Sequence, residues 1–268
     1  MARTNGGPTR ASRGAGWSAG KGPGKRTLVV DVGASKIKAS VLDAAGELVA
    51  GPVRTETPAR IGPTELVKIV ARLAAELPAY ERVSLGFPGI VVDGVVYTAP
   101  NLGTERFRGV SLAAKLSARL RRPTRVVNDA ELHALGAIVG EGVEVVMTLG
   151  TGLGMAVFCD GRPGPQFGLT PPPVKKKNGK PRTPEASGVG NAARKRLGNR
   201  KWSKQVERVF LLLRDLTEFD RLYVGGGNAK HLELELPSDI TLVDNTAAFA
   251  GGARVWQRHR LRRRRESD

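Results

Sequence analysis

The stretch from Arg125 to Gly161 constrains the fold more than any other part of this 268-residue chain. It has the pattern of an apolar strand ending at Asp129, a short helix, a second strand, and a glycine turn over residues 150–154 that leads into a third strand. A carboxylate at a strand end is suited to act as a general base, and a glycine turn presents backbone N–H groups to an anion. The stretch therefore predicts a site where acid–base chemistry and phosphate chemistry are adjacent.

The same residues also fit a purely structural interpretation. Asp129 is a suitable cap for a helix that begins at Ala130, and the glycines of residues 150–154 are typical of a hairpin turn. From this stretch alone both interpretations stay open.

The composition indicates a globular protein with charged additions. Hydrophobic residues make up 40% of the chain, which is enough for a substantial core. Cys159 is the only cysteine, which excludes an internal disulfide framework and a cysteine-cluster metal site. No apolar run approaches the roughly 18 residues needed to span a membrane, and no secretory signal is evident. We therefore expect a cytoplasmic protein without a membrane partner.

The formal charge of +18 is concentrated in three segments. Residues 1–26 contain six Lys or Arg and no acid, residues 258–268 contain six Arg and two acids, and residues 170–204 contain eleven Lys or Arg and one acid. These segments predict nonspecific binding to a polyanion such as polyphosphate or nucleic acid. Solvated tails that aid solubility are the alternative, and we favour that interpretation for the two termini.

Hydrophobic periodicity divides the chain into two halves flanked by tails. We expect a disordered basic tail at 1–26, one lobe at 27–124, a second lobe at 125–256 with a basic Pro/Lys-rich insertion at 163–184, and an Arg-rich tail at 257–268. The patterns predict strands at 28–30, 37–41, 48–57, 82–86, 143–149, 220–224 and 240–244, and helices at 63–77, 111–120, 185–197, 202–216 and from 246. Strands joined by crossover helices in both halves indicate an α/β protein with a central cleft.

Six motifs follow one another along the chain, and together they identify a resemblance. They are DVGASKIK (31–38), GFPGIV (86–91), APNL (99–102), VVNDA (126–130), LGTGLG (149–154) and YVGGGNAK (223–230). In this order they resemble the ROK family of sugar kinases, and most closely its polyphosphate glucokinase branch, over residues 27–256. The resemblance implies the actin-like ATPase fold, in which two duplicated RNase H-like lobes close on a phosphate donor and a sugar.

The resemblance also implies roles for individual residues. Asp129 matches the catalytic base, and Asp31 matches an acid that helps to hold Mg²⁺, the expected cofactor. The positions that match donor-binding residues are Asp31, Gly33, Ser35, Gly150, Thr151, Gly152, Gly225, Gly226 and Gly227. The positions that match sugar-binding residues are Asn101, Asn128 and Asp129.

The chain departs from the family after the second glycine turn. The family has an ExGH motif there, whose Glu and His contact the sugar, whereas this chain has Gln166-Phe167-Gly168-Leu169. Gln166 retains the capacity to bond a hydroxyl, but Leu169 does not, and the loss of one hydrogen bond of about 1–3 kcal/mol is enough to change the substrate. A further sugar-binding acid is matched by Glu185. The zinc cluster of other members is absent, so no zinc site is expected.

These observations lead to two hypotheses. The first is a kinase that transfers a phosphoryl group from polyphosphate or ATP to a hexose such as glucose, with Asp129 as general base. The alternative is a non-catalytic relative that binds sugar, polyphosphate or nucleic acid. A DNA-binding repressor is disfavoured because residues 1–26 leave no room for a winged-helix domain. We further expect a homodimer.

Overall fold

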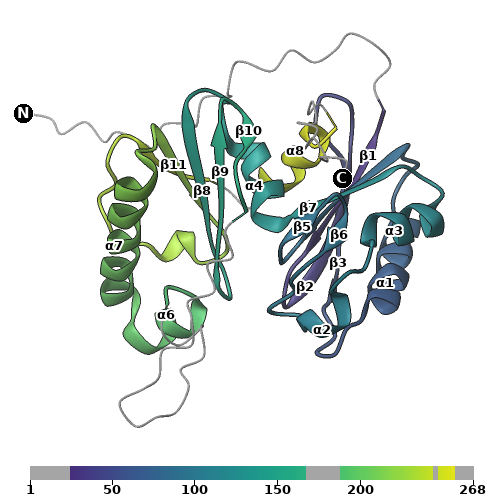
Figure 1. Ribbon diagram of the computed structural model, residues 1–268, viewed down its shortest axis with the longest axis horizontal. Coiled ribbons are helices and arrows are strands. Elements are labelled where there is room, and N and C mark those ends of the chain that lie inside the picture. Colours follow the sequence, from purple (N-terminus) through teal and green to yellow (C-terminus); the bar gives the residue numbers. More distant parts are fainter. Residues whose placement is uncertain (1–24, 167–187, 244–246, 257–268) are drawn as a thin grey trace, which may run out of the picture.

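A computed structural model describes residues 25–166, 188–243 and 247–256 of the chain (Figure 1). The expected tails therefore lie almost wholly outside the described residues, as does most of the expected insertion at 163–184. None of the helices within the described ranges has the length and hydropathy needed to cross a membrane.

The first half of the chain forms a five-stranded mixed sheet in the order β3-β2-β1-β4-β7. Its strands are β1 (Thr27–Val32), β2 (Lys36–Leu42), β3 (Leu48–Glu56), β4 (Arg82–Phe87) and β7 (Thr124–Asn128). The first three strands are an antiparallel meander, and β4 and β7 add to it in parallel. Two amphipathic helices, α1 (Pro63–Ala75) and α3 (Leu112–Leu120), bury their apolar faces in the core on one side of this sheet.

The second half repeats this topology, with the strand order β10-β9-β8-β11-β12. Its strands are β8 (Val143–Leu149), β9 (Leu153–Cys159), β10 (Arg162–Pro163), β11 (Arg221–Gly225) and β12 (Ile240–Leu242). The pair β8/β9 is antiparallel, as β1/β2 is, and β11 joins β8 in parallel, as β4 joins β1. Helices α6 (Asn191–Leu197) and α7 (Asn199–Thr217) lie on its outer side (Figure 1). The duplicated fold expected from the sequence is thus present.

Small connecting elements complete each half. In the first half they are the two-stranded hairpin β5 (Val91–Val92) and β6 (Val95–Val96), and the single turn α2 (Thr104–Phe107). In the second half, the 3₁₀ turn η1 (Ala229–His231) follows β11.

Two helices lie between the sheets and pack against each other (Figure 1). They are α4 (Asp129–Ala137), which follows β7, and α8 (Ala247–Arg254), which follows β12. Their shared core joins Val29 of the first sheet to Val146 of the second. Two glycines of α8 allow this approach, because a methyl group at Gly251 would overlap the carbonyl oxygen of Leu132, and one at Gly252 would overlap Val29.

Three boundaries differ from the sequence expectations. The second lobe was expected to begin at residue 125, but β7 pairs with β4 and is the last strand of the first sheet. Of the helix expected at 185–197, residues 185–187 lie outside the described residues, and residues 188–190 are not helical because glycines 188 and 190 do not favour helical backbone, so α6 begins at Asn191. Helix α7, expected from residue 202, begins at Asn199, and its Trp202 is fully buried in the core.

Candidate active site

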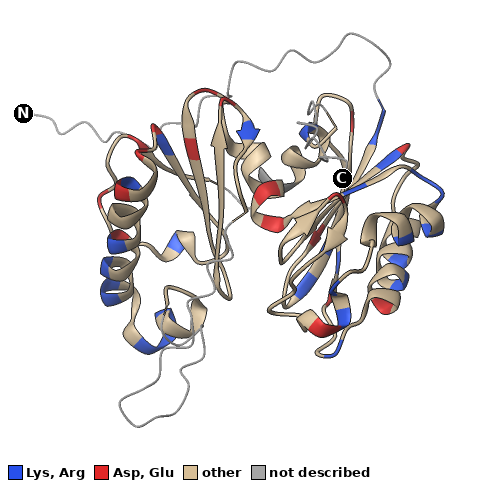
Figure 2. Cartoon of the chain, in the orientation of Figure 1, with Lys and Arg blue, Asp and Glu red and all other residues tan. Residues whose placement is uncertain are grey.

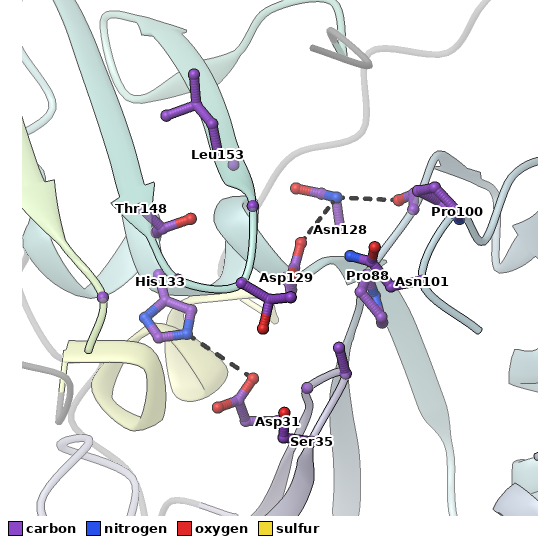
Figure 3. A pocket seen from close by; sticks show the side chains of 18 of the residues that line it. Asp31, Ser35, Pro88, Pro100, Asn101, Asn128, Asp129, His133, Thr148 and Leu153 are labelled. Atoms are coloured by element: carbon purple, nitrogen blue, oxygen red, sulfur yellow. Dashed lines mark hydrogen bonds and ion pairs between the residues drawn. The ribbon is translucent and has the colours of Figure 1, made fainter. Parts of the chain in front are cut away.

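A cavity of about 440 Å³ lies between the two halves, at the ends of their strands. It is lined by the turn joining β1 to β2, residues 33–35, which we call the first glycine turn, and by the turn joining β8 to β9, residues 150–152, the second glycine turn. The end of β7 also reaches it, so Asp129 lies between the two turns (Figure 3). Most of the site residues expected from distant parts of the sequence thus line one cavity.

Asp129 is the first residue of α4, and Asn128 caps this helix. The Asn128 Oδ1 atom accepts the backbone N–H of Glu131 at 3.2 Å, so the expected alternative role of Asp129 as the cap is not observed. The Oδ1 atom of Asp129 accepts from the N–H of Ala130 at 2.9 Å and from Asn128 Nδ2 at 3.0 Å. Among the described residues the Asp129 Oδ2 atom has no hydrogen-bond partner, and it is available to a ligand (Figure 3).

The environment of Asp129 raises its pKa above that of an ordinary aspartate. Removal of the carboxyl group from water and the nearby negative charge of Asp31 raise the pKa of Asp129 to about 6, against a weaker opposing effect of His133. A carboxyl group with a pKa near 6 is largely ionised at pH 7 and is more basic than an ordinary aspartate. Asp129 thus has the properties required of a general base.

Asp31, on β1, is the second acid that lines the cavity. Its carboxylate lies 3.6 Å from Lys38 Nζ and 3.8 Å from His133 Nε2 (Figure 3). Burial alone would raise the pKa of Asp31, but the hydrogen bonds and charges of His133 and Lys38 outweigh burial and leave this pKa below its usual value. Asp31 therefore stays ionised at pH values near 6, where Asp129 begins to take up a proton.

His133 and Lys38 were missed by sequence reasoning. His133 lies on α4 four residues after Asp129, a spacing that places two side chains on the same face of a helix. Lys38 lies on β2 opposite Asp31 in the antiparallel register. The helical spacing was thus visible in the sequence, although the pairing with Asp31 depends on the tertiary fold.

Of the expected sugar-binding residues, Asn101, Asn128 and Gln166 line the cavity together with Asp129. Asn101 is exposed, whereas Asn128 is held by Glu131, Asp129 and the carbonyl of Gly89, at 2.9 Å from its Nδ2 atom. Glu185 lies outside the described residues.

The Gln166 side chain has less hydrogen-bonding capacity left for a sugar than its sequence position suggests. Its Oε1 atom accepts the backbone N–H of Val91 at 3.0 Å, and its Nε2 atom donates to the Val91 carbonyl at 2.8 Å and to Glu131 Oε2 at 3.4 Å. The amide therefore links the segment after β10 to β5 in the first half. One remaining lone pair on Oε1 is what this side chain has left to offer a sugar.

The backbone conformation of the second glycine turn does not require glycine at residues 150 and 152. Gly150 and Gly152 have no left-handed φ, and a methyl group at either position would meet no atom within 4 Å. Gly227, which also lines the cavity, is equally open. Since neither conformation nor packing explains these glycines, they fit a role in leaving room for a ligand close to the backbone.

The third expected glycine segment is divided between packing and the cavity. Gly226 and Gly227 line the cavity, but Gly225 ends strand β11 and does not line it. Gly226 has a φ of +89°, and a methyl group there would come within 2.5 Å of the Leu149 carbonyl oxygen. Gly226 is therefore needed for the close approach of this turn to the end of β8.

The cavity supplies few carboxylates to coordinate a metal ion. No group of three or more His, Cys, Asp or Glu able to hold a metal ion occurs in residues 25–166, 188–243 and 247–256. Mg²⁺ usually takes one or two protein carboxylates, and keeps waters or substrate phosphates as its other ligands. The ionised carboxylate of Asp31 at the edge of the cavity fits that requirement.

Comparisons with known proteins agree with this architecture. Residues 27–168 match the ROK family. The chain is 29% identical over 247 residues to a polyphosphate glucokinase of Mycobacterium leprae, covering 85% of this chain and 74% of that protein. A polyphosphate glucokinase of Mycobacterium tuberculosis is 29% identical over 241 residues, covering 84% of this chain and 88% of that protein.

Solved structures show the same fold. An inorganic polyphosphate/ATP-glucomannokinase from Arthrobacter sp. strain KM superposes with a TM-score of 0.73 at 29% identity, covering 87% of this chain and 99% of that one. A ROK family glucokinase from Streptomyces griseus, in complex with glucose and AMPPNP, has a TM-score of 0.67 at 20% identity, covering 86% and 98% of the two chains. With its duplicated sheets and the actin-like ATPase fold of these neighbours, the chain belongs to the ROK family.

Proposed function

We propose that the protein is a Mg²⁺-dependent sugar kinase that transfers a phosphoryl group from inorganic polyphosphate or ATP to a hydroxyl of glucose or a related hexose. The observation that carries the proposal is the position of Asp129. Its Oδ2 atom is available in a cavity whose walls include the glycine turns of both halves. A base for the acceptor and N–H groups for the donor therefore face one space.

The proposed chemistry needs little from the protein beyond positioning and charge. The hydroxyl oxygen of the sugar forms a bond to the terminal phosphorus of the donor, and the bond from this phosphorus to the leaving oxygen breaks. Asp129 takes the proton of the hydroxyl group as the new bond forms. Backbone N–H groups of the two glycine turns stabilise the charge on the phosphoryl group during transfer.

Asp31 would hold the Mg²⁺ ion, with the phosphate oxygens of the donor as further ligands. The ion supplies positive charge that offsets the negative charge of the phosphates. Lys38 and His133 keep Asp31 ionised without a metal, so this carboxylate is ready to accept a cation.

Polyphosphate is the donor we favour alongside ATP. The relatives that span most of this chain include polyphosphate glucokinases, and the Arthrobacter protein uses both donors by its name. Residues 191–206, on α6 and the start of α7, contain six Lys or Arg and no acid (Figure 2). This basic surface adjoins the second glycine turn through Asn191, and it would attract a multiply charged donor.

A second candidate function is binding of a sugar or polyphosphate without turnover. The observation that favours it is the engagement of Gln166 by Val91 and Glu131, which leaves the acceptor side of the cavity with fewer groups for a sugar. The polar groups that remain there include Asn101, the single lone pair of Gln166, and Asp129.

A kinase assay separates the two functions. Purified protein is incubated with Mg²⁺, a panel of hexoses, and polyphosphate or ATP, and sugar phosphate is measured. We expect product with at least one pair, and a loss of kcat of roughly 10²- to 10⁴-fold in Asp129→Asn. The matched control Asp215→Asn, on the exposed face of α7, should retain the wild-type rate. Absence of product with every pair, or an active Asp129→Asn variant, would contradict the kinase mechanism.

A further inference from the structure

The second glycine turn is held from outside by two hydrogen bonds to one carbonyl group. The Gly150 oxygen accepts the backbone N–H of Asn191, the first residue of α6, at 3.0 Å. It also accepts the side-chain Nδ2 of Asn228, which follows the third glycine segment, at 2.8 Å. Both donors lie outside the turn, so the direction of this carbonyl group is set by α6 and by the end of β11.

The direction of the Gly150 carbonyl determines where the next N–H points. In a planar trans peptide the C=O and N–H groups point in opposite directions. With the Gly150 oxygen turned toward Asn191 and Asn228, the N–H of Thr151 is turned away from them. Thr151 lines the cavity, and its N–H has no hydrogen-bond partner among the described residues. An anion in the cavity is the partner this group lacks.

Arg194 on α6 determines how the Asn228 amide is oriented. Its Nε atom lies 3.2 Å from Asn228 Oδ1. A guanidinium group only donates hydrogen bonds, so the Asn228 oxygen must face Arg194 and the Asn228 nitrogen must face Gly150. Arg194 also donates to the side chains of Asn191 and Asn199, each at 3.2 Å, which holds it in place.

The first glycine turn has an equivalent arrangement with different residues. Gly33 follows β1 as Gly150 follows β8, and its carbonyl oxygen accepts from Thr57 Oγ1 at 2.8 Å. The N–H of Ala34, the counterpart of Thr151, also lacks a partner among the described residues. The same carbonyl is therefore tied back in both halves, by unrelated side chains.

We propose that Asn228, oriented by Arg194, is a positioning residue that keeps the Thr151 N–H directed at the phosphate donor. This rests on the proposed kinase function, which supplies the donor. The role is specific: Asn228 acts through the Gly150 peptide and does not itself need to touch the substrate.

The test uses two substitutions that remove the hydrogen bond to the Gly150 carbonyl. Asn228→Asp keeps an acceptor for Arg194, but it places an oxygen against the Gly150 carbonyl and removes the donor. Asn228→Ala removes both the donor and the acceptor for Arg194 without adding charge. The matched control is Asn199→Ala, which also removes an acceptor for Arg194 without adding charge, but does not reach the turn.

We expect Asn228→Asp and Asn228→Ala to raise the KM of the donor about tenfold, which corresponds to 1.4 kcal/mol, with the KM of the sugar within about twofold. Asn199→Ala should change the donor KM by less than about twofold. Thermal unfolding of all variants should stay near that of the wild type. Equal donor KM values in the wild type and both Asn228 variants, or an equal rise in Asn199→Ala, would overturn the positioning role.

Calorimetric titration with inorganic tripolyphosphate in the absence of a sugar provides a readout without turnover. We expect the same ranking of the variants in affinity. A wild-type protein that binds tripolyphosphate but makes no sugar phosphate would contradict the kinase function and leave the ranking as the test of Asn228. A wild type that neither binds nor reacts would contradict both proposals.

Discussion

The Nε2 atom of His133 lies 3.8 Å from the Oδ1 atom of Asp31, so this acid faces an imidazole from the helix that begins with Asp129. The two acids of the cavity have opposite pKa shifts: the contacts with His133 and Lys38 lower the pKa of Asp31, whereas burial and the charge of Asp31 raise the pKa of Asp129. Two titratable groups whose environments separate their pKa values are suited to different tasks. In the proposed kinase reaction, Asp31 would stay an anion and Asp129 would accept the proton.

The raised pKa of Asp129 predicts the pH dependence of the reaction. Only the ionised carboxylate is able to accept a proton, so kcat/KM should fall about tenfold per pH unit below the pKa of about 6. The measurement is the rate of sugar phosphate formation at limiting sugar from pH 4.5 to 8. A profile that remains flat down to pH 4.5 would show that Asp129 titrates as an ordinary aspartate or is not the base.

Removal of His133 should move the fall of kcat/KM at low pH, the acidic limb of the profile, to higher pH. The positive charge of His133 lowers the pKa of Asp129, and its loss leaves the repulsion from Asp31 less compensated. His133→Gln and His133→Ala should both shift the limb upward in the same kcat/KM profiles. A shift in His133→Ala alone would indicate a loss of packing, because Gln preserves most of the side-chain volume.

The ionised form of Asp129 should reduce the free energy of unfolding. The folded-state pKa is above the unfolded value of 3.8, so stability is fully present below that value and is lost as pH rises through about 6. We expect Asp129→Asn to be more stable than the wild type at pH 8, by on the order of 1–3 kcal/mol, and about equal at pH 4. Denaturant unfolding of both proteins at the two pH values measures this difference. A wild type that is more stable than Asp129→Asn at pH 8 would contradict the prediction.

Two glycines near the second glycine turn should respond differently to substitution. Gly152→Ala meets no neighbouring atom, so it should leave the melting temperature within about 2 °C while raising the donor KM. A methyl group at Gly190 would overlap the Thr151 carbonyl oxygen, so Gly190→Ala should lower the melting temperature. Thermal scans and donor titrations of both variants are the measurement. A large loss of stability in Gly152→Ala would show that this glycine is needed by the fold.

Local sequence patterns predicted most of the secondary structure because each pattern reflects one buried face. Ile37, Ala39 and Val41 alternate with other residues, and they lie buried on strand β2. The pairing of α4 with α8 was not predictable in this way. It depends on Gly251, as the contact of α8 with β1 depends on Gly252, and glycines within a short helix indicate weak helical propensity rather than close packing.

The candidate site was predictable where one segment carries both the residue and its context. Asp129 and residues 150–152 lie on neighbouring elements, and the structure places them in the same cavity. His133 and Lys38 were missed because their importance comes from contact with Asp31, which lies on another strand. The engagement of Gln166 by Val91, 75 residues away, is likewise a property of the tertiary structure.

The duplicated topology makes the two walls of the cleft comparable position by position, and they prove electrically unlike. Asp31 and its register partner Lys38 on the β1/β2 hairpin correspond to Thr148 and its register partner Gly154 on the β8/β9 hairpin. Among the described residues, this pair of positions is therefore charged in the first hairpin and uncharged in the second. A bound polyanion would be oriented by this difference, with its cation beside the first hairpin and its contacts to backbone groups at the second.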